Sequence, residues 1–194
     1  MNYFCVFCGS NLGNQTAYEL AAEAMGKALA SRNLGLVYGG GRVGLMGKVA
    51  DAVLAAGGEA IGVIPEFLAT KEIAHSGLTK LHIVSSMHER KALMASLSEG
   101  FIALPGGYGT LEEFCEILTW AQLGLHHKPL ALLNIAEYYN PLLAFFDRAL
   151  AEGFLNTTLR SLILEATTPE ILLDAMISSH PAKLTQWLEN EAEI

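Results

Sequence analysis

The chain has 194 residues, 52% of them hydrophobic, and a formal net charge of −8 from 20 acidic and 12 basic residues. This length and apolar content suit one sizeable core, so we expect a single domain over residues 1–194. The acidic balance and the lack of a basic cluster argue against a nucleic-acid polymer as partner. No apolar run reaches the ~18 residues of a membrane span, and the N-terminus lacks a charged signal region, so we expect a cytoplasmic protein without a membrane partner.

Apolar runs alternate with helical periods along the whole chain. In the first half, strands are predicted at residues 3–8, 34–38, 60–64 and 81–85, and helices at residues 16–31, 44–56 and 87–98. Residues 67–80 are mixed and polar, and they predict a surface loop. In the second half, strands are predicted at residues 101–104, 129–134 and 162–165, and helices at residues 111–122, 138–152, 169–178 and 183–190.

This alternation is typical of right-handed βαβ crossovers. We therefore expect an α/β fold with a parallel sheet covered by helices on both faces, and a peripheral C-terminal helix within residues 180–194. In such sheets ligands bind beyond the carboxyl ends of the strands, at a topological switch point. The loops at Gly9, Gly39 and Gly106 all follow predicted strands at that edge, and together they fit a nucleotide-sized site.

Two of the three cysteines form a C-x-x-C pair in the first predicted strand. Positions i and i+3 of a strand point to opposite faces, so Cys5 and Cys8 cannot share a metal ion. A thioredoxin-type pair would begin a helix, whereas these residues lie in an apolar strand. We expect reduced core thiols at both positions and at Cys115. The six histidines show no zinc-binding spacing, so no metal site is predicted.

The GGGRVGLMG stretch at residues 39–47 has two interpretations. Its glycine spacing is similar to a dinucleotide-binding turn, but that turn ordinarily follows the first strand, and an acidic residue ends the second strand. Neither condition is met here. The three leading glycines therefore either contact a ligand or allow tight packing of a strand against a helix. No G-x-x-x-x-G-K-[ST] loop is present, which argues against P-loop ATP hydrolysis.

The FIALPGGYGTLEE stretch at residues 101–113 narrows the function most. Four apolar residues predict a buried strand, and three glycines then permit a tight turn. Thr110 is predicted to cap the following helix, with Glu112 and Glu113 in its first turn. Free N–H groups and the positive end of a helix dipole attract phosphate at such a turn. Two carboxylates beside a phosphate site indicate chemistry on the ligand as well as binding.

The MHERK stretch at residues 87–91 begins another predicted helix. Two cations in a first turn oppose the helix dipole, and a bound phosphate would reverse that penalty. A solvated charged face is the alternative explanation. Arg90 can also form a bidentate pair with a carboxylate, for which Glu113 is the predicted partner.

A phosphate site, an arginine and a glutamate together permit hydrolysis of a glycosidic bond. A carboxylate can stabilise an oxocarbenium-like transition state and can orient or deprotonate water. A bound phosphate adds binding energy that positions the sugar carbon. The expected partner is a small-molecule nucleoside 5′-monophosphate. The same residue types also fit a broader AMP or purine nucleotide nucleosidase, or a nucleotide or cofactor carrier without catalysis.

Two motifs resemble one family. PGGYGTLEE at residues 105–113 matches the P-G-G-x-G-T-x-x-E signature of the LONELY GUY family of cytokinin riboside 5′-monophosphate phosphoribohydrolases, and MHERK is similar to its M-H-x-R-K element. Similar stretches at residues 5–10, 37–47 and 118–125 extend the resemblance over roughly residues 2–180. The resemblance implies a Rossmann-like, doubly wound sheet, a homodimer with its site near the subunit interface, and no cofactor or metal. It also implies cleavage of an N6-modified adenosine monophosphate to free base and ribose 5-phosphate.

The resemblance also implies roles for single residues. Arg90 and Glu113 match the catalytic pair: Arg90 would orient the carboxylate and the ribose phosphate, and Glu113 would activate water or stabilise the oxocarbenium ion. Relatives are often described as lysine decarboxylases, but no lysine here lies in a context that suggests a pyridoxal Schiff base. The positions expected to bind substrate are Ser10, Gly39, Gly40, Gly41, Glu72, Lys91, Gly106, Gly107, Tyr108, Gly109, Thr110, Leu111, Glu112 and Thr119.

The predicted helix at residues 111–122 has more apolar surface than one face needs. Phe114, Leu118 and Trp120 supply this surface. A dimer contact and core packing explain it equally well.

Overall fold

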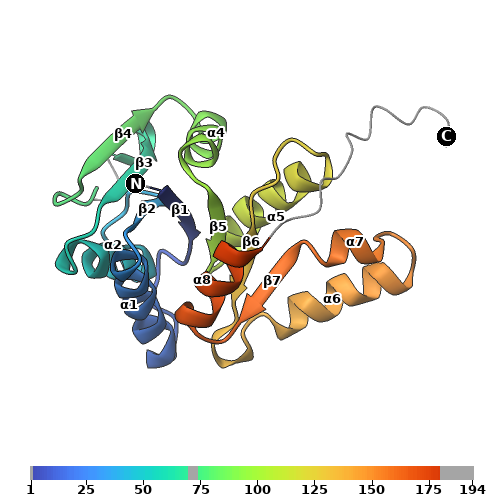
Figure 1. The fold of residues 1–194 in the computed structure, drawn as a ribbon. Coiled ribbons are helices and arrows are strands. Elements are labelled where there is room, and N and C mark those ends of the chain that lie inside the picture. Colours follow the sequence, from blue (N-terminus) through green and yellow to red (C-terminus); the bar gives the residue numbers. More distant parts are fainter. Residues whose placement is uncertain (1, 70–73, 180–194) are drawn as a thin grey trace.

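The computed structural model describes residues 2–69 and 74–179, which form one parallel sheet with helices on both faces (Figure 1). The seven strands of this part of the chain lie in the order β4-β3-β2-β1-β5-β6-β7, and all neighbouring pairs are parallel. The predicted α/β class and doubly wound parallel sheet are therefore confirmed. The strands are Asn2–Phe7 (β1), Leu34–Tyr38 (β2), Ala60–Pro65 (β3), Lys80–Val84 (β4), Gly100–Ala103 (β5), Leu130–Leu133 (β6) and Ile163–Ala166 (β7).

The helices of the described residues mostly follow the predicted periods. The two longest, α1 and α5, follow the neighbouring strands β1 and β5 along the chain. The helices are Thr16–Ser31 (α1), Gly44–Ala55 (α2), Glu66–Ala69 (α3), Met87–Leu97 (α4), Tyr108–Gln122 (α5), the 3-10 helix Ile135–Glu137 (η1), Asn140–Ala151 (α6), Thr157–Arg160 (α7) and Pro169–Ser178 (α8).

Two apolar clusters, one on each face of the sheet, hold the layers together. Helices α1, α2 and α8 pack on one face, where Met25 and Leu172 are fully buried. Helices α4, α5 and α6 cover the other face with Met94 and Phe114 in their cluster (Figure 1). Each such side chain stabilises the fold by roughly 1.5–3 kcal/mol through its removal from water.

The cysteines confirm the predicted alternation of the first strand. Cys5 packs in the cluster under α4 and α5, and Cys8 packs in the cluster under α1 and α2, so the two thiols lie on opposite faces. Both are buried and free, as predicted. Cys115 is also free but only half-buried.

Helix α5 begins three residues earlier than predicted. Gly107 is its N-cap and Tyr108 its first residue, so Thr110 lies inside the first turn, and no acidic residue is in that turn. The prediction that Thr110 caps the helix with Glu112 and Glu113 in the first turn is therefore wrong. The helix begins at a glycine N-cap instead of a threonine, and glycine has no side chain that could accept a hydrogen bond from the first N–H groups of the helix. The N–H groups at this helix end are left for another acceptor.

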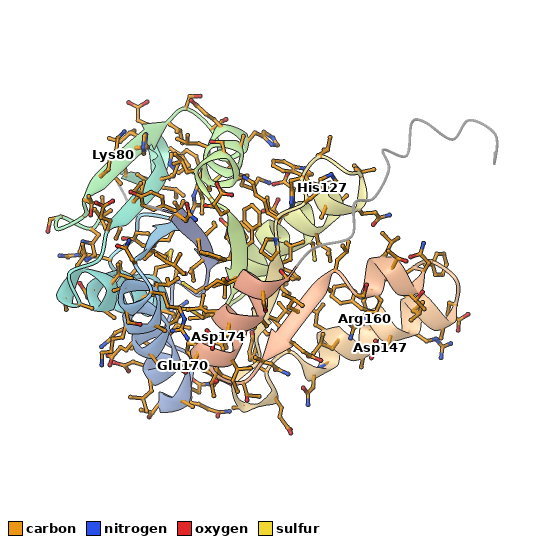
Figure 2. The ribbon with its side chains drawn as sticks, viewed as in Figure 1. Lys80, His127, Asp147, Arg160, Glu170 and Asp174 are labelled. Atoms are coloured by element: carbon orange, nitrogen blue, oxygen red, sulfur yellow. The ribbon has the colours of Figure 1, made fainter. Side chains whose placement is uncertain are left out.

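The predicted helix at residues 138–152 corresponds to α6, which begins two residues later than predicted. The 3-10 helix η1 just before it was not predicted, and within η1 Ala136 and Glu137 are in the left-handed region, at φ 49° and φ 60°. The short helices α3 and α7 were not predicted. Arg160 fixes α7 beside α6, because its Nε donates to Asp147 Oδ1 at 2.6 Å, and Figure 2 shows the two side chains close together. The predicted helix at residues 183–190 lies outside the described residues, as does Glu72.

The topological switch point lies between β1 and β5. From β1 the chain proceeds outward to β2, β3 and β4, and from β5 it proceeds the other way to β6 and β7. The two loops that leave the carboxyl ends of these strands touch, since Gly9 N donates to Pro105 O at 3.1 Å. A ligand crevice is expected at this place in an open α/β sheet.

Across residues 2–69 and 74–179, no helix combines the length and the apolar character needed to cross a membrane.

Candidate active site

A cavity of about 420 Å³ opens at the switch point, a size in the range of small-molecule sites. The loop after β1 and the loop after β5 form two of its walls. Side chains from α1, α2, α4 and α5, and Tyr138 after η1, complete the cavity. The lining residues that the sequence predicted are Ser10, Arg90, Gly106, Gly107, Tyr108, Gly109, Thr110 and Glu113.

The start of α5 is suited to hold a phosphate. The first N–H groups of a helix have no acceptor within the helix and carry the positive end of its dipole. A Cβ atom at Gly106 would lie 2.0 Å from Thr110 Oγ1 and 2.9 Å from Gly9 N, so the tight turn requires glycine there. At Gly107 and Gly109 an added Cβ would meet nothing within 4 Å. Glycine at these two positions leaves open space beside the free N–H groups, where a ligand can approach the backbone.

Arg90 and Glu113 both line the cavity and form an ion pair, so the predicted partner of Arg90 is confirmed, although their separation is too long for the predicted bidentate hydrogen bonds. Arg90 Nη2 lies 3.7 Å from Glu113 Oε1, and each residue is only 8% exposed. Arg90 is held in this position from α4, since its Nε donates to Val63 O of β3 at 3.1 Å. Two oppositely charged groups of a buried pair therefore line the same cavity as the glycine-rich turn at the start of α5.

Burial raises the pKa of Glu113 to about 7. Removal from water is the largest cause, and the neighbouring carboxylates of Glu112 and Glu116 add to it. The positive charges of Arg90 and Lys91 act in the opposite direction and limit the rise. A carboxyl group with a pKa near neutrality can both take up and release a proton at physiological pH, which suits a general acid or base.

Gly39 supports the arginine instead of forming the cavity wall. A Cβ atom at Gly39 would lie 2.1 Å from Arg90 Nη2 and 3.1 Å from Met46 Sδ. Gly40 adopts a left-handed φ of 80°, and Gly41 bridges to Ala74. Gly39, Gly40 and Gly41 are not among the described residues that line the cavity. Of the two interpretations of this stretch, the geometry favours packing, with Gly39 placing the guanidinium group.

Replacing Gly39 with Ala should lower turnover about 10- to 100-fold, because the added Cβ displaces the Arg90 guanidinium group by about an ångström or more. The measurement is the steady-state rate, together with the melting temperature. Gly153→Ala is the control, since its Cβ would meet nothing within 4 Å and its effect comes only from the left-handed φ of 82°, far from Arg90 in sequence. That variant should lose some stability and keep its rate. Equal rates in the wild type and Gly39→Ala would contradict the supporting role.

Besides the three glycines at residues 39–41, four predicted substrate contacts within the described residues do not line the cavity. Lys91 Nζ is held 2.5 Å from Glu112 Oε1 and 3.0 Å from Glu116 Oε2, and Lys91 is buried. Thr119 lies about two turns after Glu112 in α5, and its Oγ1 donates to Cys115 O at 2.8 Å. Lys91, Leu111, Glu112 and Thr119 are absent from the described lining. Glu72 lies outside the described residues.

Sequence reasoning missed the less polar wall of the cavity. The residues concerned come from segments far apart in the chain, and no local motif marks them. The one usable signal was the pair of adjacent tyrosines after β6, at the same edge of the sheet as the glycine loops. Gly9 lies in a loop that was predicted to form the site, and the lining residues that were not predicted are Cys8, Asn11, Leu12, Gly13, Tyr18, Leu45, Met46, Pro105 and Tyr138.

Solved structures share the fold at low sequence identity. A molybdenum cofactor carrier protein from Chlamydomonas reinhardtii superposes with a TM-score of 0.70 at 20% identity, covering 92% of this chain and 99% of that one. A molybdenum cofactor binding protein from Rippkaea orientalis gives a TM-score of 0.69 at 21% identity, covering 91% and 96%. These similarities support the fold alone.

Relatives at much higher identity share one name. A cytokinin riboside 5′-monophosphate phosphoribohydrolase of Rhodococcoides fascians is 58% identical over 160 residues, 82% of this chain and 81% of that protein. A probable enzyme of the same name from Oryza sativa subsp. japonica is 54% identical over 172 residues, 89% and 82% of the two chains. One from Arabidopsis thaliana is 52% identical over 169 residues, 87% and 79%.

A protein-family model described as "Possible lysine decarboxylase" matches residues 46–176. Together with these relatives, it shows that the chain belongs to the family of the cytokinin riboside 5′-monophosphate phosphoribohydrolases, as its two signature motifs predicted.

Proposed function

We propose that this protein hydrolyses the N-glycosidic bond of an adenosine 5′-monophosphate, with or without an N6 substituent, to free base and ribose 5-phosphate. The observation that carries the proposal is the buried Arg90–Glu113 pair, which lines the same cavity as the open N-terminus of α5. The relatives at 52–58% identity are named for this reaction on cytokinin riboside 5′-monophosphates.

Two parts of the cavity bind different parts of the substrate. The N–H groups at the start of α5 bind the 5′-phosphate and thereby place the anomeric carbon near Glu113. The carboxylate then removes a proton from water, or stabilises the oxocarbenium-like transition state, while the bond from the anomeric carbon to the base nitrogen breaks. The water oxygen bonds to the anomeric carbon, and the departing base takes a proton. Arg90 holds the carboxylate and contributes positive charge for the phosphoribose.

The site does not support the other description of the family, which concerns lysine decarboxylation. Such chemistry with a pyridoxal cofactor needs a lysine at the reacting centre. Lys91, the lysine nearest the catalytic pair in sequence, is held between Glu112 and Glu116. No lysine occurs among the described residues that line the cavity.

A homodimer is part of the proposal. Leu111, Leu118 and Trp120 of α5 remain only partly buried, and Phe145 of α6 is 65% exposed. A second copy on this face would cover that apolar surface. It would also bring Thr119 and Glu112, which lie outside their own cavity, closer to a site at the subunit interface. Sedimentation equilibrium tests the assembly, and a monomer at micromolar concentration would contradict it. The cytoplasmic location stays a prediction.

Product analysis tests the reaction. The purified protein is incubated with AMP, GMP, isopentenyl-AMP and adenosine, and the free base is separated by chromatography. We expect release of base from the adenine monophosphates and little release from adenosine, because the phosphate supplies the positioning energy. Equal rates on AMP and adenosine would contradict this role of the phosphate. Tight AMP binding without product would favour a carrier, and equal rates on AMP and GMP a broader nucleosidase.

A further inference from the structure

Tyr138 is a cavity residue without a role in the reaction as described above. Its side chain lines the cavity, and its hydroxyl donates to the carbonyl oxygen of Gly106 at 2.5 Å. The ring also packs edge-on against Tyr18 of α1, with ring centres 5.7 Å apart. Tyr138 thus connects the turn before α5 to another wall of the cavity, although it lies 32 residues further along the chain.

A costly backbone conformation places this side chain. Ala136 and Glu137, immediately before Tyr138, are both left-handed, which non-glycine residues rarely adopt, and such strain persists only where surrounding contacts enforce it. The buried Asn134 side chain supplies two of these contacts. Its Oδ1 accepts from Tyr139 N at 2.8 Å, and its Nδ2 donates to Asn140 Oδ1 at 2.8 Å. The turn is therefore held in a shape that directs Tyr138 to the glycine loop.

The hydrogen bond of Tyr138 acts on one peptide unit of the phosphate-binding turn. The peptide between Gly106 and Gly107 is trans, so its C=O and N–H point in nearly opposite directions. Fixing the carbonyl of Gly106 therefore also fixes the direction of the Gly107 N–H. Side-chain packing does not restrain Gly107, since even an added Cβ would meet nothing within 4 Å.

We propose that Tyr138 is a positioning residue, which holds the Gly106 carbonyl so that the Gly107 N–H is oriented for the 5′-phosphate of the substrate. The proposal rests on the function proposed above and extends it by one residue. A pre-oriented donor binds phosphate without the entropy loss of ordering a glycine peptide. Tyr138 therefore strengthens binding of the phosphate and does not change the rate of the bond-breaking step.

Tyr139 offers a matched control. Its hydroxyl donates to Leu104 O at 2.6 Å, two residues before Gly106 in the same turn. The next residue is Pro105, which has no N–H, so this bond cannot orient a donor. Tyr139 is also 2% exposed, whereas Tyr138 is 40% exposed at the cavity, where water can replace its hydroxyl. Loss of the Tyr139 hydroxyl should therefore lower the stability of the fold, and loss of the Tyr138 hydroxyl should weaken binding of the ligand.

The experiment measures the Kd of AMP and of adenosine by calorimetry in the full chain carrying Glu113→Gln, which prevents turnover. Adding Tyr138→Phe should weaken AMP binding about fivefold, the usual size of one hydrogen-bond effect, and leave the Kd of adenosine unchanged. Adding Tyr139→Phe should lower the melting temperature more and leave the ratio of the two Kd values as it was. In the active enzyme, Tyr138→Phe should raise KM for AMP with kcat within about twofold.

If the wild type hydrolyses AMP but Tyr138→Phe leaves the ratio of the AMP and adenosine Kd values unchanged, the role of Tyr138 is overturned and the proposed function stands. If the Glu113→Gln protein binds AMP and adenosine equally well, there is no phosphate site and both proposals are overturned. If AMP binds better than adenosine but the wild type releases no base, hydrolysis alone is refuted, and the fivefold loss would still support Tyr138.

Discussion

Replacing Glu113 with Gln should lower kcat for an adenosine monophosphate by at least about 100-fold and leave its binding nearly intact. The amide keeps the size of the side chain but cannot accept a proton from water, and it carries no negative charge for the oxocarbenium-like state. The wild-type kcat/KM should rise with pH through about 7, because the ionised carboxylate is the active form and burial raises the pKa of Glu113 to about 7.

The measurement is single-turnover release of base, together with calorimetry of AMP binding. Glu170→Gln is the control, since this exposed glutamate lies on α8, on the other face of the sheet from α5, and does not line the cavity. Full turnover in Glu113→Gln would refute the role assigned to this carboxylate. The phosphate group also titrates near pH 6, so the pH profile is compared with that of AMP binding.

The same substitution should stabilise the folded protein above neutral pH. The pKa of Glu113 rises from its ordinary 4.5 to about 7 on folding. Between these values the folded state holds a proton that the unfolded chain has released, so stability falls as pH rises through this window. At pH 8 the buried negative charge therefore costs roughly 3 kcal/mol, which the neutral amide removes. Urea denaturation at pH 4 and pH 8 measures this difference. No gain for the variant at pH 8 would show that the carboxylate is solvated.

Replacing Arg90 with Ala should lower kcat by about 100-fold or more and move the remaining activity to higher pH. The guanidinium group attracts the Glu113 carboxylate from 3.7 Å and holds its pKa below the value that burial alone would set. Without this charge, the carboxyl group stays protonated to higher pH. The loss of a positively charged hydrogen-bond donor to the phosphoribose lowers the rate further.

The pH dependence of kcat/KM between about pH 5.5 and 9.5 tests this prediction. Arg90→Lys is the matched variant, since it keeps a positive charge near Glu113 but loses the planar fork that bonds to Val63 O. Its pH midpoint should stay close to that of the wild type, although its rate should fall. An unchanged midpoint in Arg90→Ala would show that the two groups do not interact, whatever happens to the rate.

Much of the fold could be predicted because its signals are local. The bounds of α1, β2 and α8 match the predicted ranges, since a 3.6-residue period and a short apolar run are written within each segment. The meeting of Arg90 and Glu113 was also predictable, because the helices that follow parallel strands begin at the same edge of a sheet. The predicted start of α5 was wrong because threonine is a commoner N-cap residue than glycine, which made Thr110 the expected cap, whereas the N-cap is Gly107.

The parallel α/β sheet, the succession of its elements along the chain and the two motifs that identify the family could be read from the amino-acid sequence, since each depends on residues close together in the chain. Three-dimensional packing was needed to show that Gly39 supports Arg90, that Glu113 is buried enough for a pKa of about 7, and that Tyr138 holds the Gly106 carbonyl. These properties arise from contacts between segments far apart in sequence and from the exclusion of water by the whole fold, and no local pattern encodes either.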